Sequence, residues 1–237
     1  MSRTIAIIQQ RLGNTRLKNK ALLPLCGIPM TQHIVDRCKR AKLVNEVVVA
    51  CPFKDAIVLG EALDATIVAP DVPENDLIGR YYTVAKGMEA DFVVRVSGDN
   101  PCIEPAEIDF LVAAANGGAC GKFLLLMNSE NFRKQHDGFG GELYMIAMLE
   151  WMNKTIEEPK YREHPHKFWI QLQTDVYCGK EYPEDFRLDV NTQADYEKIR
   201  DIYEHCYPQN HEFGIKEILE YLNGKNDLEK RNLPAGK

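Results

Sequence analysis

The chain has 237 residues and a formal net charge of −6 at pH 7, and 45% of its residues are hydrophobic. A chain of this length and apolar content can bury a complete core, which excludes extended disorder. Its pI of about 5.6 argues against a general surface for nucleic acid or for an anionic membrane, so we expect neither partner.

The cysteines and the N-terminus indicate the compartment. Seven cysteines are widely scattered, no two of them form a Cys-x-x-Cys pair, and the first residues carry no signal-peptide pattern. These features predict a reducing cytoplasm and no thiolate metal site. No apolar run approaches the roughly 20 residues that a membrane-spanning helix needs, so we expect no membrane insertion.

Short apolar runs alternate with helical patterns along the chain. We expect strands at residues 5–8, 47–50, 66–69, 92–96 and 123–127. Helices are expected from Pro29, taken as the first helical position, through Ala41, then at residues 78–88, and from Pro105 through Leu111. This alternation predicts an α/β fold with a mostly parallel central sheet, helices on both faces, and ligands at the carboxyl ends of the strands.

The second half of the chain is less regular. We find no internal repeat or linker, and therefore expect a single domain over residues 1–226, with an irregular region at about 128–182 and a frayed tail at 227–237. Within the irregular region, Leu143, Ile146, Ala147 and Trp151 recur at helical spacing. This spacing predicts a helix face that packs in the core or against a second copy of the chain.

The first apolar run leads into a cationic loop that reads Gln9-Gln10-Arg11-Leu12-Gly13-Asn14-Thr15-Arg16-Leu17-Lys18-Asn19-Lys20. Backbone N–H groups together with Arg and Lys side chains predict an anion receptor suited to a polyphosphate. The loop is not a Walker A motif, because Gly13 is not followed at the required spacing by Gly-Lys-Ser/Thr. The alternative interpretation is a solvated basic loop.

Two further segments carry candidate metal ligands. Asp99 follows an expected strand within Ser97-Gly98-Asp99-Asn100-Pro101, a placement that suits one ligand of Mg²⁺ bound to a triphosphate, although the same residues also form an ordinary turn. Residues 186–191 are expected to form a strand that brings Asp189 and Asn191 to one face. A helix should begin at Thr192 with Asp195 as its capping-box partner.

The ordered motifs together resemble those of the cytidylyltransferases that make CMP-activated acidic sugars. They are Gln-x-Arg-x-Gly-x-Thr-Arg-Leu-x-x-Lys, Leu-Pro-Leu-x-Gly-x-Pro-Met, Gly79-Arg80-Tyr81-Tyr82 and Gly98-Asp99-x-Pro101. The pattern is similar to that of the 3-deoxy-manno-octulosonate cytidylyltransferase family and its spore-coat polysaccharide biosynthesis protein F branch, from Thr4 to about Leu222. This resemblance implies a Rossmann-like nucleotidyltransferase fold, Mg²⁺ as cofactor, transfer of CMP from CTP to a small acidic sugar-like acceptor with release of pyrophosphate, a role in surface polysaccharide or glycoconjugate biosynthesis, and a homodimer.

Carried over residue by residue, the resemblance implies the members of the site. The residues that stabilise the reacting phosphates are Arg11, Arg16 and Lys20. The nucleotide-binding residues are Gln9, Arg11, Gly13, Asn14, Thr15, Arg16, Lys20, Arg80, Ser97 and Gly98. The metal ligands are Asp99 with Asp189 and Asn191, and the acceptor-binding residues are Asp137, Glu142, Arg162, Glu163 and His164.

The chain departs from the family pattern at several positions. Lys18-Asn19 stands where the family usually has Pro-Gly, which predicts a less rigid loop. Asn191 replaces the second metal aspartate, so we expect Asp189 to supply most of the missing charge. Gly140 stands where the acceptor segment usually has an acid.

Three alternatives stay open. The cluster of Arg162, His164, His166 and Lys167 either reads a carboxylate or phosphate of the acceptor or belongs to an ordinary charged surface loop. The residues do not show which base the site reads, so GTP or UTP could replace CTP. The Asn191 substitution also leaves open a catalytically silent nucleotide-binding regulator.

Overall fold

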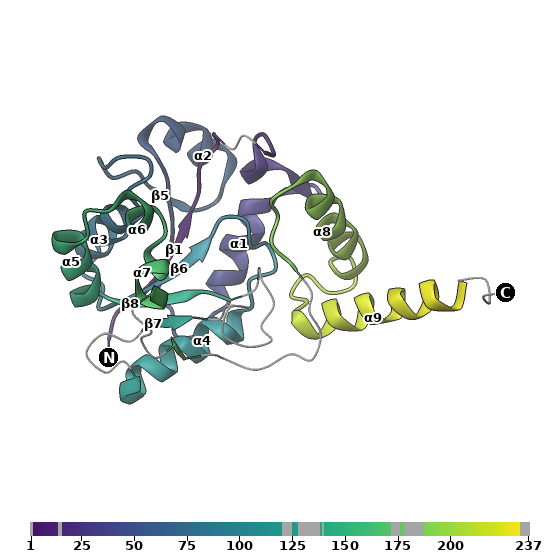
Figure 1. Cartoon of the computed structure of the whole chain (residues 1–237). Coiled ribbons are helices and arrows are strands. Elements are labelled where there is room, and N and C mark those ends of the chain that lie inside the picture. Colours follow the sequence, from purple (N-terminus) through teal and green to yellow (C-terminus); the bar gives the residue numbers. More distant parts are fainter. Residues whose placement is uncertain are drawn as a thin grey trace.

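The computed structural model describes residues 2–13, 16–119, 125–127, 138, 140–171, 176–177 and 187–232. A seven-stranded sheet lies at its centre, in the order β5-β4-β1-β6-β8-β7-β9 (Figure 1). The strands are β1 (Thr4–Gln9), β4 (Glu46–Ala50), β5 (Thr66–Val68), β6 (Phe92–Ser97), β7 (Leu125–Met127), β8 (Glu142–Met145) and β9 (Val176–Tyr177). β5, β4, β1 and β6 are mutually parallel, while β8 runs antiparallel to both β6 and β7, and β7 is parallel to β9. The predicted mostly parallel sheet is confirmed.

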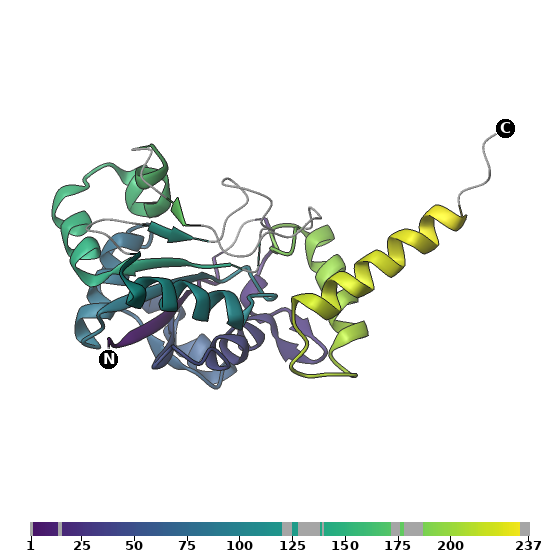
Figure 2. The same cartoon turned by 90° about the horizontal axis from the view of Figure 1, so that it is seen from below.

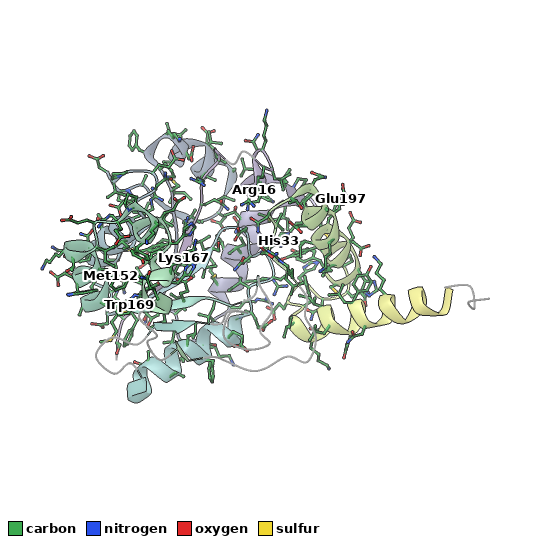
Figure 3. The ribbon with its side chains drawn as sticks, viewed as in Figure 1. Arg16, His33, Met152, Lys167, Trp169 and Glu197 are labelled. Carbon is green, nitrogen blue, oxygen red and sulfur yellow. The ribbon has the colours of Figure 1, made fainter. Side chains whose placement is uncertain are left out.

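Helices cover both faces of this sheet (Figures 1 and 2). On one face, α1 (Met30–Lys39), α2 (Ala56–Ala62) and α4 (Pro105–Ala114) enclose a core that contains Ala6 and Ile8. On the other face, α3 (Leu77–Gly87), α5 (Ile146–Thr155), α6 (Pro159–Glu163) and α7 (Pro165–Gln171) enclose a core that contains Ile5 and Ile7. Successive side chains of a strand point to opposite faces, so alternate residues of β1 enter different cores. Met152 and Trp169 mark the second core in Figure 3.

A third core lies beside α1, where α8 (Gln193–Cys206) and α9 (Ile215–Asn232) pack on the hairpin of β2 (Pro24–Leu25) and β3 (Ile28–Pro29). His33 of α1 faces this core, with its ring centroid 4.5 Å from that of Tyr203 (Figure 3). Leu188 and Val190 are fully buried in the same core. Their burial places Asp189 and Asn191 close to the carboxyl ends of the strands.

Most elements expected in the first half of the chain are present. The five predicted strands are found as β1, β4, β5, β6 and β7, although residues 123–124 lie outside the described part. The helices predicted at 78–88 and from Pro105 are α3 and α4. Pro29, by contrast, is the N-cap of α1 and the last residue of β3, because its ψ of 137° is extended and not helical.

Residues 187–190 are extended but do not form the predicted strand. Val190 N donates to Asp99 O at 2.8 Å, and this neighbour is a loop that follows β6. A loop offers no continuous row of backbone groups, so no ladder develops. The predicted α8 cap is confirmed: Thr192 and Asp195 form a reciprocal capping box.

The second half is more regular than predicted. The region at 128–182 contains β8, α5, α6, α7 and β9. Leu143 lies in β8 and not on the helix with Ile146, because an apolar spacing of three fits both a strand end and a helix face. The buried face of α5 is Met148, Leu149 and Met152.

The tail differs too, because α9 continues through Asn232. Its last turns contain Leu, Glu, Lys and Arg, which favour helix without tertiary support. α9 projects from the body in Figure 2. No helix within the described ranges is both long and apolar enough to cross a membrane.

Candidate nucleotide-binding site

A polar cavity of about 330 Å³ lies at the carboxyl ends of β1 and β6. It brings together side chains from five separate segments of the sequence. Its lining residues are Gln9, Gln10, Arg11, Arg16, Lys20, Glu74, Asn75, Leu77, Arg80, Arg95, Ser97, Gly98, Asp99, Glu163, His164 and Asn191.

The loop after β1 is anchored at both ends. Leu12 N donates to the buried Asp55 at 3.0 Å, and Leu17 packs in the third core. Arg16 is exposed and its NH2 approaches Asn191 Oδ1 at 3.4 Å, across the cavity. Arg16 therefore presents a solvent-accessible guanidinium to the cavity, one residue before the buried Leu17.

Asn19 explains how the loop tolerates its departure from the Pro-Gly pattern. Its φ is 51° and ψ is 29°, in the left-handed region that glycine adopts most easily. Asparagine is among the non-glycine residues that enter this region most often. Asn19 can therefore precede the 3₁₀ turn Lys20–Leu22 with the same backbone turn as a glycine.

Lys20 lies inside the protein and not on the solvated loop surface. It is 8% exposed, its Nζ donates to Val190 O at 2.6 Å, and it lies 3.3 Å from Asp99 Oδ2. The ammonium thus joins the loop after β1 to the loop after β6 and to the segment before α8.

Gly98 lets these loops approach one another. A Cβ at this position would lie 2.3 Å from the carbonyl oxygen of Gln9 and 2.7 Å from Gln10 Nε2. Gln10 Nε2 donates to Gly98 O at 3.0 Å and to Thr31 Oγ1 at 2.7 Å. Any side chain at position 98 would separate β1 from the loop that carries Asp99.

Arg80 forms a buried wall of the cavity. It is 2% exposed, and its NH2 donates to the carbonyl oxygens of Glu74 at 3.0 Å and Pro73 at 3.4 Å. Burial lowers the pKa of Arg80 from its usual value, although a guanidinium remains charged at neutral pH. Arg11 contacts the same segment, with NH1 3.7 Å from Glu74 Oε1 and 3.4 Å from Asn75 Oδ1.

Asn191 lines the cavity, whereas Asp189, which we expected to supply most of the missing charge, does not. Asn191 Nδ2 donates to Asp189 Oδ2, and Asp189 also pairs with Arg187 at 3.0 Å. The amide nitrogen of Asn191 is thereby occupied, so its Oδ1 is the atom turned to Arg16 and the cavity. Asp195 of the capping box accepts from Asn191 N at 3.0 Å and fixes the backbone there.

The floor of the cavity is a buried polar network around Arg95 of β6. Arg95 NH1 pairs with Glu142, Arg95 Nε donates to Tyr81 Oη at 3.2 Å, and Tyr81 in turn donates to Gln9. Burial would raise the pKa of Glu142, but the Arg95 charge and the contacts with His166 and Tyr144 outweigh it and hold the pKa at about 2. Glu142 is therefore ionised and paired beneath the cavity.

The predicted acceptor residues separate into two groups. Glu163 and His164 line the cavity, and burial followed by the Lys167 charge lowers the pKa of His164, which favours the neutral ring at pH 7. Arg162 points away: it forms a two-contact pair with Asp76, the N-cap of α3, at 2.9 and 2.7 Å. Glu142 is buried below the floor, so neither Arg162 nor Glu142 is brought to the cavity.

Some predicted residues lie elsewhere. Asn14, Thr15 and Asp137 are outside the described residues. Gly13 is exposed on the loop, beside Glu74. The cavity is also lined by residues that we did not predict, namely Gln10, Glu74, Asn75, Leu77 and Arg95. Arg95 alone carried a signal, as a single charge within the otherwise apolar run of β6.

The oxygen donors at the cavity fit Mg²⁺ in kind. Asp99 offers a carboxylate and Asn191 an amide oxygen, and both are hard ligands of the type that this ion prefers. No cluster of three or more His, Cys, Asp or Glu able to hold a metal occurs in the part of the chain that the structure describes. Mg²⁺ characteristically keeps waters and uses one or two carboxylates with substrate phosphates, so this small donor set is compatible with it.

The comparisons with known proteins agree with this geometry. The sequence model of a family described as cytidylyltransferase matches residues 5–119, which include β1, the basic loop and the Asp99 loop. This segment, a little under half of the chain, is therefore similar to cytidylyltransferases. At this level the predicted nucleotidyltransferase is confirmed.

The relatives differ in how much of the chain they cover. A 3-deoxy-manno-octulosonate cytidylyltransferase of Trichlorobacter lovleyi is 35% identical over 44% of this chain and 42% of its own length. An uncharacterised protein of Methanocaldococcus jannaschii is 28% identical over 96% of this chain and 93% of its own. The spore coat polysaccharide biosynthesis protein SpsF of Bacillus subtilis is 24% identical over 96% and 97%. The octulosonate enzyme thus matches less than half of this chain and of its own length, whereas SpsF and the archaeal protein match nearly all of both.

Solved structures show the same fold. A cytidylyltransferase from Leptospira borgpetersenii superposes with a TM-score of 0.82 at 24% identity, over 100% of both chains. A CMP:2-keto-3-deoxy-manno-octonic acid synthetase complexed with CTP superposes with a TM-score of 0.64 at 20% identity, over 86% of this chain and 99% of its own. The predicted Rossmann-like nucleotidyltransferase fold is confirmed.

Proposed function

We propose that this protein is a Mg²⁺-dependent cytidylyltransferase that transfers CMP from CTP to an acidic sugar or similar acceptor and releases pyrophosphate. The observation that carries the proposal is the convergence of Arg11, Arg16, Lys20 and Arg80 with Asp99 on one cavity. These four cations suit the negative charge of a triphosphate, and the Asp99 carboxylate suits the Mg²⁺ ion that accompanies a triphosphate. The relatives that act on 3-deoxy-manno-octulosonate support an acidic sugar as acceptor.

The proposed reaction makes one bond and breaks one. An oxygen of the acceptor attacks the α-phosphorus of CTP, a new oxygen–phosphorus bond forms, and the bond to the bridging oxygen of the departing pyrophosphate breaks. Mg²⁺, held by Asp99 and Asn191, would supply a Lewis acid that neutralises phosphate charge. Arg16 and Arg11 bind the phosphates from the loop, and Lys20 supports the same charge from below while it fixes Asp99.

We place the acceptor beside Glu163 and His164, two lining residues that we do not assign to the nucleotide. Glu163 and His164 lie on α6 and its C-cap, across the cavity from the basic loop. A neutral His164 can donate one hydrogen bond and accept another, which suits sugar hydroxyl groups. Arg95 on the floor adds the guanidinium that an acidic acceptor would face.

The decisive assay incubates the purified chain with each of the four nucleoside triphosphates, Mg²⁺ and a panel of acidic sugars, and measures pyrophosphate release. CTP should be the productive nucleotide. A preference for GTP or UTP would replace the base assignment, and nucleotide binding without release on any acceptor would support the silent regulator.

Two loop variants connect this assay to the cavity. Arg16→Ala should lower the rate by on the order of a hundredfold, the usual loss when a phosphate contact is removed. Lys18→Ala is the matched control, because Lys18 is exposed on the same loop and does not line the cavity. Equal activity of the two variants would return the loop to the solvated-surface interpretation.

The homodimer stays a prediction of the family resemblance, and the cytoplasmic location stays a prediction from the cysteines and the N-terminal sequence. Light scattering of the purified chain tests the first, and fractionation of the source cells tests the second.

A further inference from the structure

The loop that carries Asp99 is held through its backbone carbonyls. On the cavity side, Gln10 Nε2 donates to Gly98 O at 3.0 Å and Val190 N donates to Asp99 O at 2.8 Å. On the far side, Tyr203 of α8 donates from its hydroxyl to Pro101 O at 2.6 Å. The carboxylate of Asp99 thus depends on contacts made on both sides of it along the chain.

The Tyr203 hydroxyl is itself fixed. Tyr203 is fully buried, and its Oη accepts from Arg37 Nε at 3.3 Å while Arg37 NH1 reaches Ile103 O at 3.4 Å. The Arg37 guanidinium lies 4.4 Å from the ring centroid of Phe213, a cation–π contact. Burial raises the pKa of Tyr203 above its usual value, so the hydroxyl keeps the proton that it donates to Pro101.

Pro101 makes this contact effective. It has no backbone N–H and its φ is locked by the ring, so its carbonyl is its only hydrogen-bonding group and rotation at this residue is restricted. Asp99 precedes it by two residues, within a turn closed by Asn100 N to Ser97 O at 3.2 Å and Ile103 N to Asn100 O at 3.1 Å. A displaced Pro101 carbonyl would therefore move the turn that carries Asp99.

We propose that Tyr203 is a positioning residue for Asp99, acting through the Pro101 carbonyl. The proposal rests on the proposed function, in which Asp99 binds the metal with the nucleotide. It also gives the C-terminal helices a task in the reaction: Tyr203 lies beyond residues 5–119 that match the family model, yet it reaches the loop that ends within them.

The test compares two tyrosines of α8. Tyr203→Phe removes one oxygen and keeps the ring in its core. Tyr196→Phe is the matched control, because Tyr196 also donates from its hydroxyl to a proline carbonyl, Pro24 O at 2.6 Å, in a different loop. Both variants lose one hydrogen bond to a proline carbonyl, and Tyr203→Phe alone loses one to the Asp99 loop. Tyr203→Phe also removes the acceptor of Arg37 Nε, so the readouts are taken at the Asp99 loop itself.

Hydrogen exchange supplies the first readout. Amides in a peptide spanning residues 97–104 should exchange faster in Tyr203→Phe than in wild type, and at the wild-type rate in Tyr196→Phe. The second readout is the Mg²⁺ concentration that gives half of the CTP-induced rise in melting temperature. It should increase roughly threefold to tenfold in Tyr203→Phe, the range expected for one lost hydrogen bond. In the turnover assay kcat should fall while the KM for the acceptor stays constant.

Identical exchange at residues 97–104 and an identical Mg²⁺ requirement in the two variants would overturn the proposal and leave Tyr203 as a packing residue. The failure of the proposed function looks different: wild type itself would then show no response to Mg²⁺ and CTP. The exchange measurement does not use either ligand, so the two failures can be told apart.

Discussion

Lys20 and Asp99 make the contact that joins the separate loops of the site. Their side chains are 10% and 24% exposed, and Lys20 Nζ also donates to Val190 O. A partly buried ion pair of this kind holds its members more firmly than a surface pair, because fewer waters compete for the charges. Lys20 and Asp99 are therefore held in place by each other and by the Val190 carbonyl.

At the same scale, the proposed Mg²⁺ site can be tested at three side chains, Asp99, Asn191 and Asp189. Asp99→Asn should lower Mg²⁺-dependent pyrophosphate release by about a hundredfold or more, because an amide does not offset the dication. Asn191→Ala should raise the Mg²⁺ requirement more than Asp189→Asn, since Asn191 lines the cavity and Asp189 orients it from behind. Mg²⁺ titrations of initial rate measure both effects.

Asn191→Asp restores the carboxylate of the family pattern and serves as the comparison. It should keep or increase activity if the wild type is a working enzyme. Full activity of Asp99→Asn would contradict the metal assignment, and activity seen only in Asn191→Asp would favour the silent regulator.

The contribution of the buried Arg95–Glu142 pair to stability can be tested by a substitution at Glu142. Glu142→Gln leaves Arg95 buried without its counter-charge and should lower the free energy of unfolding at pH 7 by about 3–5 kcal/mol. The Glu142 pKa of about 2 lies below its usual 4.5, so its contribution is complete above about pH 4.5 and is lost as the pH falls towards 2. Urea unfolding at pH 7 and pH 3 should show a smaller difference in the variant than in wild type.

Glu150→Gln is the matched control for that measurement, because Glu150 forms an exposed i,i+4 pair with Lys154. It should leave stability close to that of wild type, because exposed pairs contribute little. A Glu142→Gln protein as stable as wild type would mean that the floor network does not depend on this charge.

At the scale of elements, the start of α8 orders the segment beside the cavity. Its capping box supplies Asp195 as acceptor for the backbone N–H groups of Asn191 and Thr192, at 3.0 and 2.7 Å. The Asp195 carboxylate thus both caps the start of α8 and fixes the backbone of Asn191. The hydrogen bonds that it accepts hold the pKa of Asp195 below its usual value against the opposing effect of burial.

Thr192→Ala should lower the free energy of unfolding by about 1 kcal/mol, because it removes the side-chain acceptor for Asp195 N. Thermal or urea unfolding measures the change. Gln193→Ala, one residue later and exposed, should stay within about 0.5 kcal/mol of wild type. Equal stability of all three proteins would show that the cap contributes nothing measurable.

At the scale of the whole molecule, residues from both halves of the chain line the cavity. A ligand that contacts both halves should therefore stabilise the entire fold against unfolding. A ligand at about 100 times its Kd adds about 2.7 kcal/mol, which for a chain of this size raises Tm by roughly 5–10 °C. With Mg²⁺, CTP should give the largest rise of the four triphosphates. Arg16→Ala should reduce this rise and Lys18→Ala should not.

Much of the fold could be predicted because its signals are local. β1, β4 and β6 are apolar runs buried on both sides, and the alternation of such runs with helices requires a covered, mostly parallel sheet. The capping box of α8 was readable for the same reason, since its partners are three residues apart. Leu143 and residues 187–190 were misassigned because periodicity cannot tell whether a short run meets a strand or a loop.

The sequence alone identifies the residues whose chemistry suits the site: the cations that follow β1 suit phosphate, and the carboxylate of Asp99 after β6 suits a metal ion. Only the tertiary structure decided their roles. In the folded chain Lys20 is buried against Asp99, and Arg162 pairs with Asp76 at the start of α3. Arg95 lines the cavity, and the Tyr203 hydroxyl donates to Pro101 O. The physical reason is that a charge or a hydroxyl acts over a few ångströms, whereas its partner can be far away along the chain. Lys20 and Asp99 are 79 residues apart, Asp76 and Arg162 are 86 apart, and Pro101 and Tyr203 are 102 apart.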